Sequence, residues 1–171
     1  MSLRYIAAAA AFLAPPLLMS SDSLLIRFIS EPGLLMQRIA LVAFIPAIAG
    51  IAVLAQDRAQ WQVAGGALIA VLGALAIITR SSFLAAPTRP PAVLFPLGLL
   101  VMSGARIGSA VSRRVAALIG AGALLFPFAH ISGVPAALIG CDVILLAAFW
   151  SLARRMTNPK PQIQNPKPQV S

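Results

Sequence analysis

Side chains that carry out chemistry are scarce in this sequence of 171 residues. It has one cysteine, one histidine and four acidic residues, and the acidic residues are scattered along the chain. Hydrolytic metal centres need several His, Cys or carboxylate ligands together, and nucleotide-binding enzymes need a glycine-rich phosphate loop, which is missing here. With Cys141 as its single cysteine, the chain also has no disulfide of its own. These absences predict a protein that is not an enzyme and holds no metal.

Charged residues are equally few, at 10% of the chain, whereas hydrophobic residues make up 60% and the mean hydropathy is +0.93. Soluble proteins carry about 25% charged residues, and a soluble chain this apolar would aggregate through its exposed surface. The apolar residues form six runs of roughly 15 to 20 residues, close to the ~20 that cross a hydrocarbon core of ~30 Å as a helix. The runs are Tyr5–Met19, Ile39–Ala55, Trp61–Thr79, Ala92–Ile107, Val115–Ile131 and Val134–Leu152. The sequence therefore predicts an all-α, polytopic transmembrane helical bundle.

The number of spans depends on the fourth run. It shares Ser103–Arg114 with the fifth run and leaves almost no connector, so we expect six spans, or five if Ala92–Met102 is a re-entrant or interfacial piece. The first run follows Arg4 in the manner of a secretory signal. No convincing small-x-small cleavage site lies around Met19–Ser21, which favours a retained first helix.

Prolines are expected to interrupt the first two spans. Pro15-Pro16 should kink the first helix or break it into two pieces. Leu24–Ile29 then continues this helix or lies along the interface, before Glu31-Pro32-Gly33 turns the chain. Pro135 suits the first turn of the last span, where its missing N–H costs nothing.

Small residues are frequent in the spans and let helix backbones approach each other, because lipid supplies no hydrophobic drive between helices. Gly104 and Gly108 form a G-x-x-x-G pair, and Gly120 and Gly122 belong to a second stretch of small residues. We expect these glycines to pack helices within the chain, with dimerisation through Gly104 and Gly108 as the alternative.

The net charge of +9 does not indicate nucleic acid binding, because the basic residues stand singly or in pairs at the ends of apolar runs. With six spans and a cytoplasmic N-terminus, nine basic residues fall inside and four outside, in agreement with the positive-inside rule. The inside residues are Arg4, Arg58, Arg106, Arg113, Arg114, Arg154, Arg155, Lys160 and Lys167, and the outside residues are Arg27, Arg38, Arg80 and Arg89. Tyr5, Trp61 and Trp150 fall at the same inner interface.

These two signals predict a multi-pass protein with both termini in the cytoplasm. Its use of Arg over Lys and its richness in Ala and Leu suggest a GC-rich bacterium, and hence the bacterial cytoplasmic (inner) membrane. The chain divides into a transmembrane bundle, residues 1–156, and a Pro-rich low-complexity tail, residues 157–171, in which Asn-Pro-Lys-Pro-Gln occurs twice. A tail of this composition is expected to be disordered, with a ligand for an aromatic groove as the alternative.

Asp142 is the most suggestive polar residue, because it lies about 12 Å along the axis of the last span, near the middle of a bilayer. An acidic group at this depth is a functional hypothesis by default, as a proton carrier or cation site, or else it is hydrogen-bonded across the bundle. The facing stretch of the fifth span, Gly120–Leu124, has small residues that give it room. Arg106 in the fourth span is the nearest candidate cation.

His130 is the single histidine and closes the fifth span at the outer interface. It is a weak candidate for ligating a haem or a pigment, but a histidine at a helix end is usually just hydrated. No cofactor is predicted, although contacts with lipid, haem or pigment stay open.

Two functions remain. The first is a non-catalytic integral subunit that scaffolds or stabilises a larger membrane complex, for example a respiratory or photosynthetic one, with the lipid bilayer and other integral subunits as partners. The second is a small proton- or cation-coupled transporter or channel that acts as an oligomer through Asp142.

Overall fold

A computed structural model of the chain describes residues 3–27, 30–54, 60–79, 90–104 and 113–158. These residues form six helices and, within the described ranges, no strand. The helices are α1 (Leu3–Ile26), α2 (Ser30–Leu54), α3 (Gln60–Thr79), α4 (Pro90–Gly104), α5 (Arg113–Ser132) and α6 (Pro135–Thr157). The prediction of an all-α bundle is confirmed.

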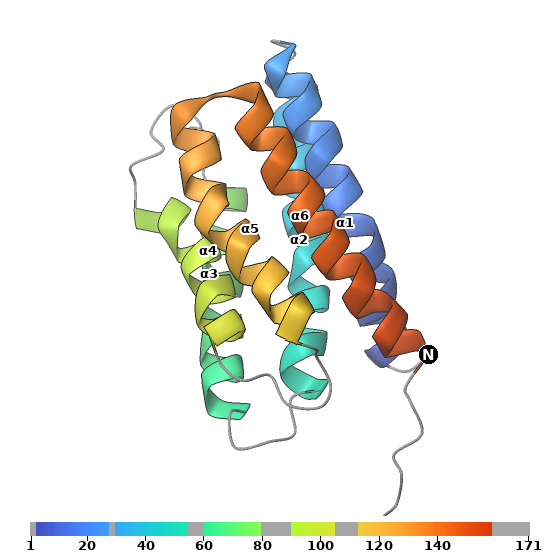
Figure 1. The fold of residues 1–171 in the computed structure, drawn as a ribbon. Helices are drawn as coiled ribbons and strands as arrows, with labels where there is room; N and C mark the ends of the chain where they lie inside the picture. The colour runs from blue at the N-terminus through green and yellow to red at the C-terminus, as the bar shows by residue number, and fades with distance from the viewer. Residues whose placement is uncertain (1–2, 28–29, 55–59, 80–89, 105–112, 159–171) are drawn as a thin grey trace, which may run out of the picture.

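The helices are arranged as a closed ring in chain order (Figure 1). Each helix packs against the next one along the chain, and α6 closes the ring by packing against α1. Since successive helices run in opposite directions, the start of α1 and the end of α6 lie at the same end of the bundle (Figure 1). We call this end the lower end and the end with the α5–α6 connection the upper end.

Five helices are long and apolar enough to cross a membrane, which makes the chain a multi-pass membrane protein by length and composition. α4 is the exception, as its 15 residues rise only about 22 Å against a hydrocarbon core of ~30 Å. It is nevertheless a helix packed against α3 and α5, so the fourth apolar run is part of the bundle.

Of the two outcomes expected at Pro15-Pro16, the break does not occur, because α1 is continuous from Leu3 to Ile26 with both prolines inside it. The helix also continues through Leu24, which was one of the alternatives for Leu24–Ile29. Pro16 has no N–H to donate to the carbonyl of Phe12, four residues earlier. The indole Nε1 of Trp150 donates to that carbonyl instead, at 2.9 Å. The Trp150 ring also stacks on Phe12, with centroids 4.8 Å apart and planes at 8°. A side chain of α6 therefore supplies the hydrogen bond that a proline removes from α1. Because Phe12 is the tenth of the 24 residues of α1, Trp150 lies beside the middle of this helix, and the prediction that it lies at the inner interface is wrong.

This arrangement predicts that the effect of Trp150→Phe depends on Pro16. The substitution keeps an aromatic ring on Phe12 but leaves its carbonyl without a donor, so we expect the free energy of unfolding to fall by about 1–3 kcal/mol. In a Pro16→Ala background the alanine N–H donates to the same carbonyl, and the loss should shrink. A double-mutant cycle of thermal unfolding in detergent measures the difference. An equal loss in both backgrounds would assign the contribution of Trp150 to stacking alone.

The second helix also differs from expectation, since it begins at Ser30 rather than near Ile39. The segment Glu31-Pro32-Gly33 does not turn the chain but forms the first turn of α2. Proline is tolerated there, and the negative charge of Glu31 interacts favourably with the positive end of the helix dipole. The buried Oγ of Ser21 donates to the carbonyl of Gly33 at 2.9 Å and joins the end of α1 to the start of α2.

Glycines lie where helices approach each other closely. Of the glycines expected to do so, Gly120 and Gly122 do and Gly104 does not. A Cβ at Gly120 would come within 2.8 Å of the Ser103 hydroxyl, and one at Gly122 would overlap Leu145. Gly104 is exposed, and a Cβ at this position would meet nothing within 4 Å among the described residues, so Gly104 does not pack helices there. Another close crossing joins Gly66 of α3 to Gly98 of α4, where a Cβ at Gly98 would overlap the backbone of Gly66 and Ala70.

Several expected features lie outside the described residues. They are Gly108, Arg58, Arg80, Arg89, Arg106 and the tail from residue 159 onward, including Lys160 and Lys167. The basic residues that the structure does describe are unevenly placed. Arg4, Arg113, Arg114, Arg154 and Arg155 lie in terminal turns at the lower end, whereas Arg27 and Arg38 lie toward the upper end, with the acidic Glu31.

Candidate functional site

The short connection between α5 and α6 positions two titratable side chains, His130 and Asp142. α5 ends at Ser132, and Gly133 follows it with φ of 62°, a left-handed conformation that glycine adopts without strain. Its N–H donates to the carbonyl of Ala129 at 3.1 Å. Pro135 then occupies the first turn of α6, as predicted. This short connection sets the last turn of α5 beside the first turns of α6.

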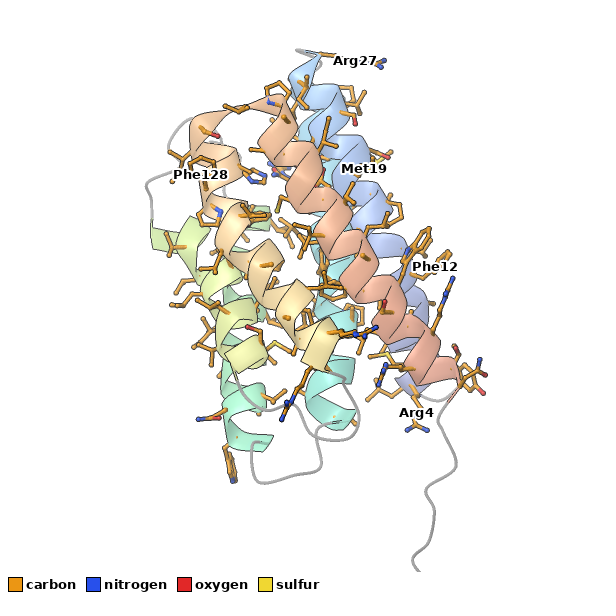
Figure 2. All side chains as sticks on the ribbon, in the orientation of Figure 1. Arg4, Phe12, Met19, Arg27 and Phe128 are labelled. Atoms are coloured by element: carbon orange, nitrogen blue, oxygen red, sulfur yellow. The ribbon has the colours of Figure 1, made fainter. Side chains whose placement is uncertain are left out.

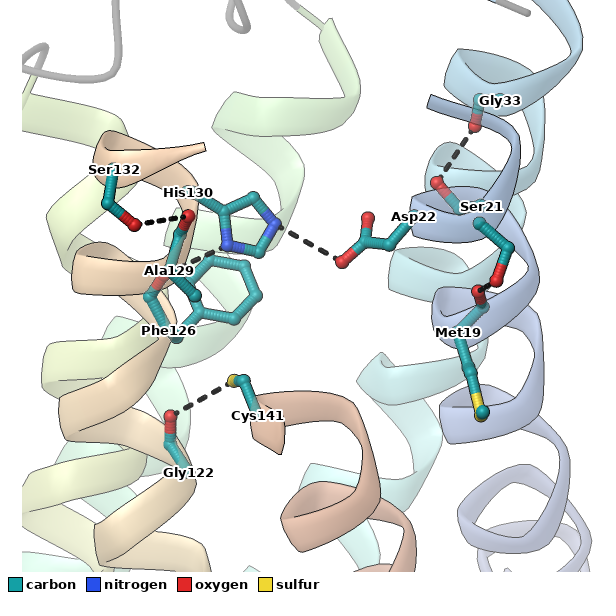
Figure 3. A network of polar contacts seen from close by, with 11 residues as sticks. Met19, Ser21, Asp22, Gly33, Gly122, Phe126, Ala129, His130, Ser132 and Cys141 are labelled. Carbon is teal, nitrogen blue, oxygen red and sulfur yellow. Dashed lines mark hydrogen bonds and ion pairs between the residues drawn. The ribbon is translucent and has the colours of Figure 1, made fainter. Parts of the chain in front are cut away.

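His130 points into the bundle rather than toward the surface (Figure 3). Its side chain is 11% exposed, and its Nε2 lies 3.6 Å from Oδ2 of Asp22, which is 2% exposed. The Nδ1 atom lies 2.9 Å from the carbonyl of Phe126, and the imidazole stacks on the Phe126 ring with centroids 4.2 Å apart. Since a carbonyl only accepts, Nδ1 carries a proton and donates to it. The other ring nitrogen, Nε2, faces the Asp22 carboxyl at a distance longer than a hydrogen bond.

Asp142 is a second buried carboxyl, 1% exposed, on α6. It lies seven residues after Pro135, about 10 Å into the helix. The charge of Asp22 acts on the Asp142 carboxyl, but no hydrogen bond joins the two side chains. Among the described residues, no group hydrogen-bonds to either oxygen of Asp22 or Asp142, or to Nε2 of His130. Buried polar groups are normally satisfied, so these five unsatisfied atoms need an explanation.

The cluster of Asp22, His130 and Asp142 lies in the upper half of the bundle. His130 is two residues from the end of α5, and Asp22 is four residues from the end of α1. Below the cluster, four phenylalanines from four helices pack edge to face, with centroids 4.9–5.7 Å apart. They are Phe44, Phe95, Phe126 and Phe149. The described side chains buried beyond this aromatic layer are apolar, so the cluster is closed from the lower end.

The sequence pattern identified Asp142 as buried, but led to a wrong placement of His130 and gave no role to Asp22. It predicted a hydrated His130 at a helix end, whereas the ring is held inside by Phe126 and Asp22. The apolar run of the first span stops at Met19, three residues before Asp22. The buried positions of α1 include Ala11, Ala14, Leu18 and Asp22, which share one helical face. Asp22 therefore continues a stripe of helical period, and that signal was available in the sequence.

The sequence predicts that Asp142 faces Gly120–Leu124 of α5. The structure shows this pairing one residue earlier, where the thiol of Cys141 lies 3.5 Å from the carbonyl of Gly122. Arg106, the expected cation, lies outside the described residues. No described group of three or more His, Cys, Asp or Glu side chains is arranged to hold a metal ion. The geometry does not favour haem or pigment ligation by His130 either, because both ring nitrogens face protein atoms. Proton exchange is the chemistry that this arrangement allows.

Comparisons of the chain with protein-family models, with curated proteins and with solved structures found no match.

Proposed function

We propose that the chain is a small proton-coupled membrane transporter that acts as an oligomer, with the Asp22–His130–Asp142 cluster as its proton-binding site. The observation that carries this proposal is the set of five buried, unsatisfied atoms on three titratable side chains. Ionisable residues inside a membrane bundle are costly and are associated with proton relays and substrate pathways.

A purely structural role accounts poorly for this cluster. A polar network that holds helices together stabilises them when its donors and acceptors are paired, and it costs free energy when they are not. Here both carboxyls lack donors, and the ion pair of His130 with Asp22 is long, at 3.6 Å. The cluster is more easily understood as a site that gains and loses a proton during a cycle.

The order of the three side chains supports a route. A proton from the upper end first meets His130, the most exposed of the three, passes from Nε2 to the Asp22 carboxyl, and then reaches Asp142 deeper in the bundle. In this conformation the four phenylalanines separate Asp142 from the lower end. Release on the other side requires these rings to separate, as in a transporter whose site opens alternately to the two sides. Among the residues that the structure describes, five Arg lie at the lower end and two toward the upper end, which supports placing the lower end in the cytoplasm.

The second candidate function is a non-catalytic subunit of a larger membrane complex. The described α4 favours it, because a helix rising about 22 Å is short for a ~30 Å core and would be covered by neighbouring subunits. Isolation from native membranes in mild detergent tests this candidate. A large particle with stoichiometric partners supports the subunit, whereas a homo-oligomer supports the transporter.

Proton flux into vesicles tests the first proposal. The purified protein is reconstituted in liposomes that contain a pH-sensitive dye, and an ionophore-driven membrane potential supplies the driving force. We expect flux above that of empty liposomes, and a loss of about tenfold or more in Asp22→Asn and in His130→Gln, in line with the removal of a positioned acid or base. Glu31→Gln is the matched control, because Glu31 is an exposed acid toward the same end. Wild-type flux no faster than empty liposomes, or equal losses in all three variants, would rule the proposal out.

A further inference from the structure

An open groove with a volume of about 550 Å³ runs along the outside of the bundle between α1 and α6. Its lining residues are Pro16, Met19, Ser20, Ser23, Leu24, Arg27, Leu146 and Trp150. The α1 wall extends from Pro16 to Arg27, about 16 Å at the rise of a helix. This is close to the half-thickness, about 15 Å, of a ~30 Å hydrocarbon core. The groove therefore has the length of one membrane leaflet.

The polar groups along the groove are already used within the protein. The hydroxyl of Ser20 donates to the carbonyl of Pro16, and that of Ser23 donates to the carbonyl of Met19, each at 2.8 Å. The indole N–H of Trp150 donates to the carbonyl of Phe12. Because these three donors are already hydrogen-bonded, most of the groove surface presents apolar atoms. The exception is the exposed Arg27, which follows α1 at the upper end (Figure 2).

We propose that this groove binds one acyl chain of an anionic phospholipid, with the phosphate at Arg27 and the end of the chain near Trp150. A guanidinium at headgroup depth matches the charge of the phosphate, and juxtamembrane basic residues attract anionic lipids. The leaflet-length apolar wall matches the chain, and the bilayer that surrounds α1 and α6 supplies the lipid directly. Neither the charge of Arg27 nor the length of the groove involves the proton-binding cluster.

Quenching of Trp150 by brominated lipids tests the proposal. The chain has two tryptophans, so Trp61→Phe leaves Trp150 as the single tryptophan, which is excited selectively over Tyr5 at the red edge of the absorption band. This variant is reconstituted in vesicles that contain an increasing mole fraction of either phosphatidylglycerol or phosphatidylcholine brominated near the chain end. We expect half-maximal quenching at a mole fraction about fivefold lower for phosphatidylglycerol, the preference that corresponds to ~1 kcal/mol for one basic residue at the surface.

Two further variants of the Trp61→Phe protein separate Arg27 from general surface charge. Arg27→Gln should abolish the preference for phosphatidylglycerol. Arg38→Gln, which removes a cation of α2 that does not line the groove, should retain it. Equal quenching by the two lipids before either substitution would show contact with bulk lipid only, and the absence of quenching by both would show that another protein segment fills the groove. Either result overturns the proposal.

Discussion

Replacing Asp142 by leucine will make the protein more stable and will abolish its proton flux. The carboxyl is buried and has no hydrogen-bond partner among the described residues, so its removal relieves a desolvation cost. Replacing buried ionic groups by apolar residues of similar volume is often neutral or stabilising by about 1–4 kcal/mol. Thermal unfolding in detergent measures the gain in stability, and the liposome assay measures the loss of flux.

Two companion variants show which property of Asp142 matters. Asp142→Asn keeps the shape of the side chain but cannot ionise, so it should also abolish flux, without the gain in stability that leucine brings. Val143→Leu changes an exposed neighbour on the same helix and should alter neither quantity. If Asp142→Leu instead lowers stability and retains flux, the carboxyl is a structural group, and the proposed proton-binding site is wrong.

Replacing Gly98 by alanine will destabilise the bundle at the crossing of α3 and α4. A Cβ at this position would overlap the backbone of Gly66 and Ala70, and backbone atoms cannot move aside as the end of a flexible side chain can. We expect a loss of about 1–3 kcal/mol, the usual cost of overpacking. The measurement is the shift in thermal unfolding of the purified protein.

Gly65→Ala is the matched control for this prediction, because a Cβ at Gly65 meets nothing within 4 Å among the described residues. Alanine is favoured over glycine inside a helix by roughly 0.5–1 kcal/mol, so this variant should be as stable as the wild type or more stable. Equal effects of Gly65→Ala and Gly98→Ala would show that α3 and α4 do not cross as closely as described.

The helices were predictable and their ends were not. Five of the apolar runs lie in helices long enough to cross a membrane, because each run is a property of consecutive residues. The boundaries near Pro15, Pro16 and Pro32 were missed for two reasons. Proline is compatible with the first turn of α2, and a side chain from α6 compensates for Pro16 in α1.

The candidate site was predictable only in part. Asp142 was identified because a single carboxyl deep in an apolar run is conspicuous in the sequence alone. Its association with Asp22 and His130 was missed, because Asp22 lies beyond the end of an apolar run and the lone histidine lies at a helix end. The Gly66–Gly98 crossing was missed for a related reason, since the chain has 12 glycines and their spacing does not indicate which of them face another helix.

Three features follow from the order of residues alone: the protein is helical, its helices have membrane length, and basic residues mark the ends of its apolar runs. Each of these features depends on the local order of residues, through the hydrophobicity of a run and the position of charges beside it. The tertiary structure alone decided that Asp22 on α1 meets His130 on α5 near Asp142 on α6. It also decided that a groove opens between α1 and α6. The physical reason is that α6 packs against α1 to close the ring, and this contact joins residues that are far apart in the chain.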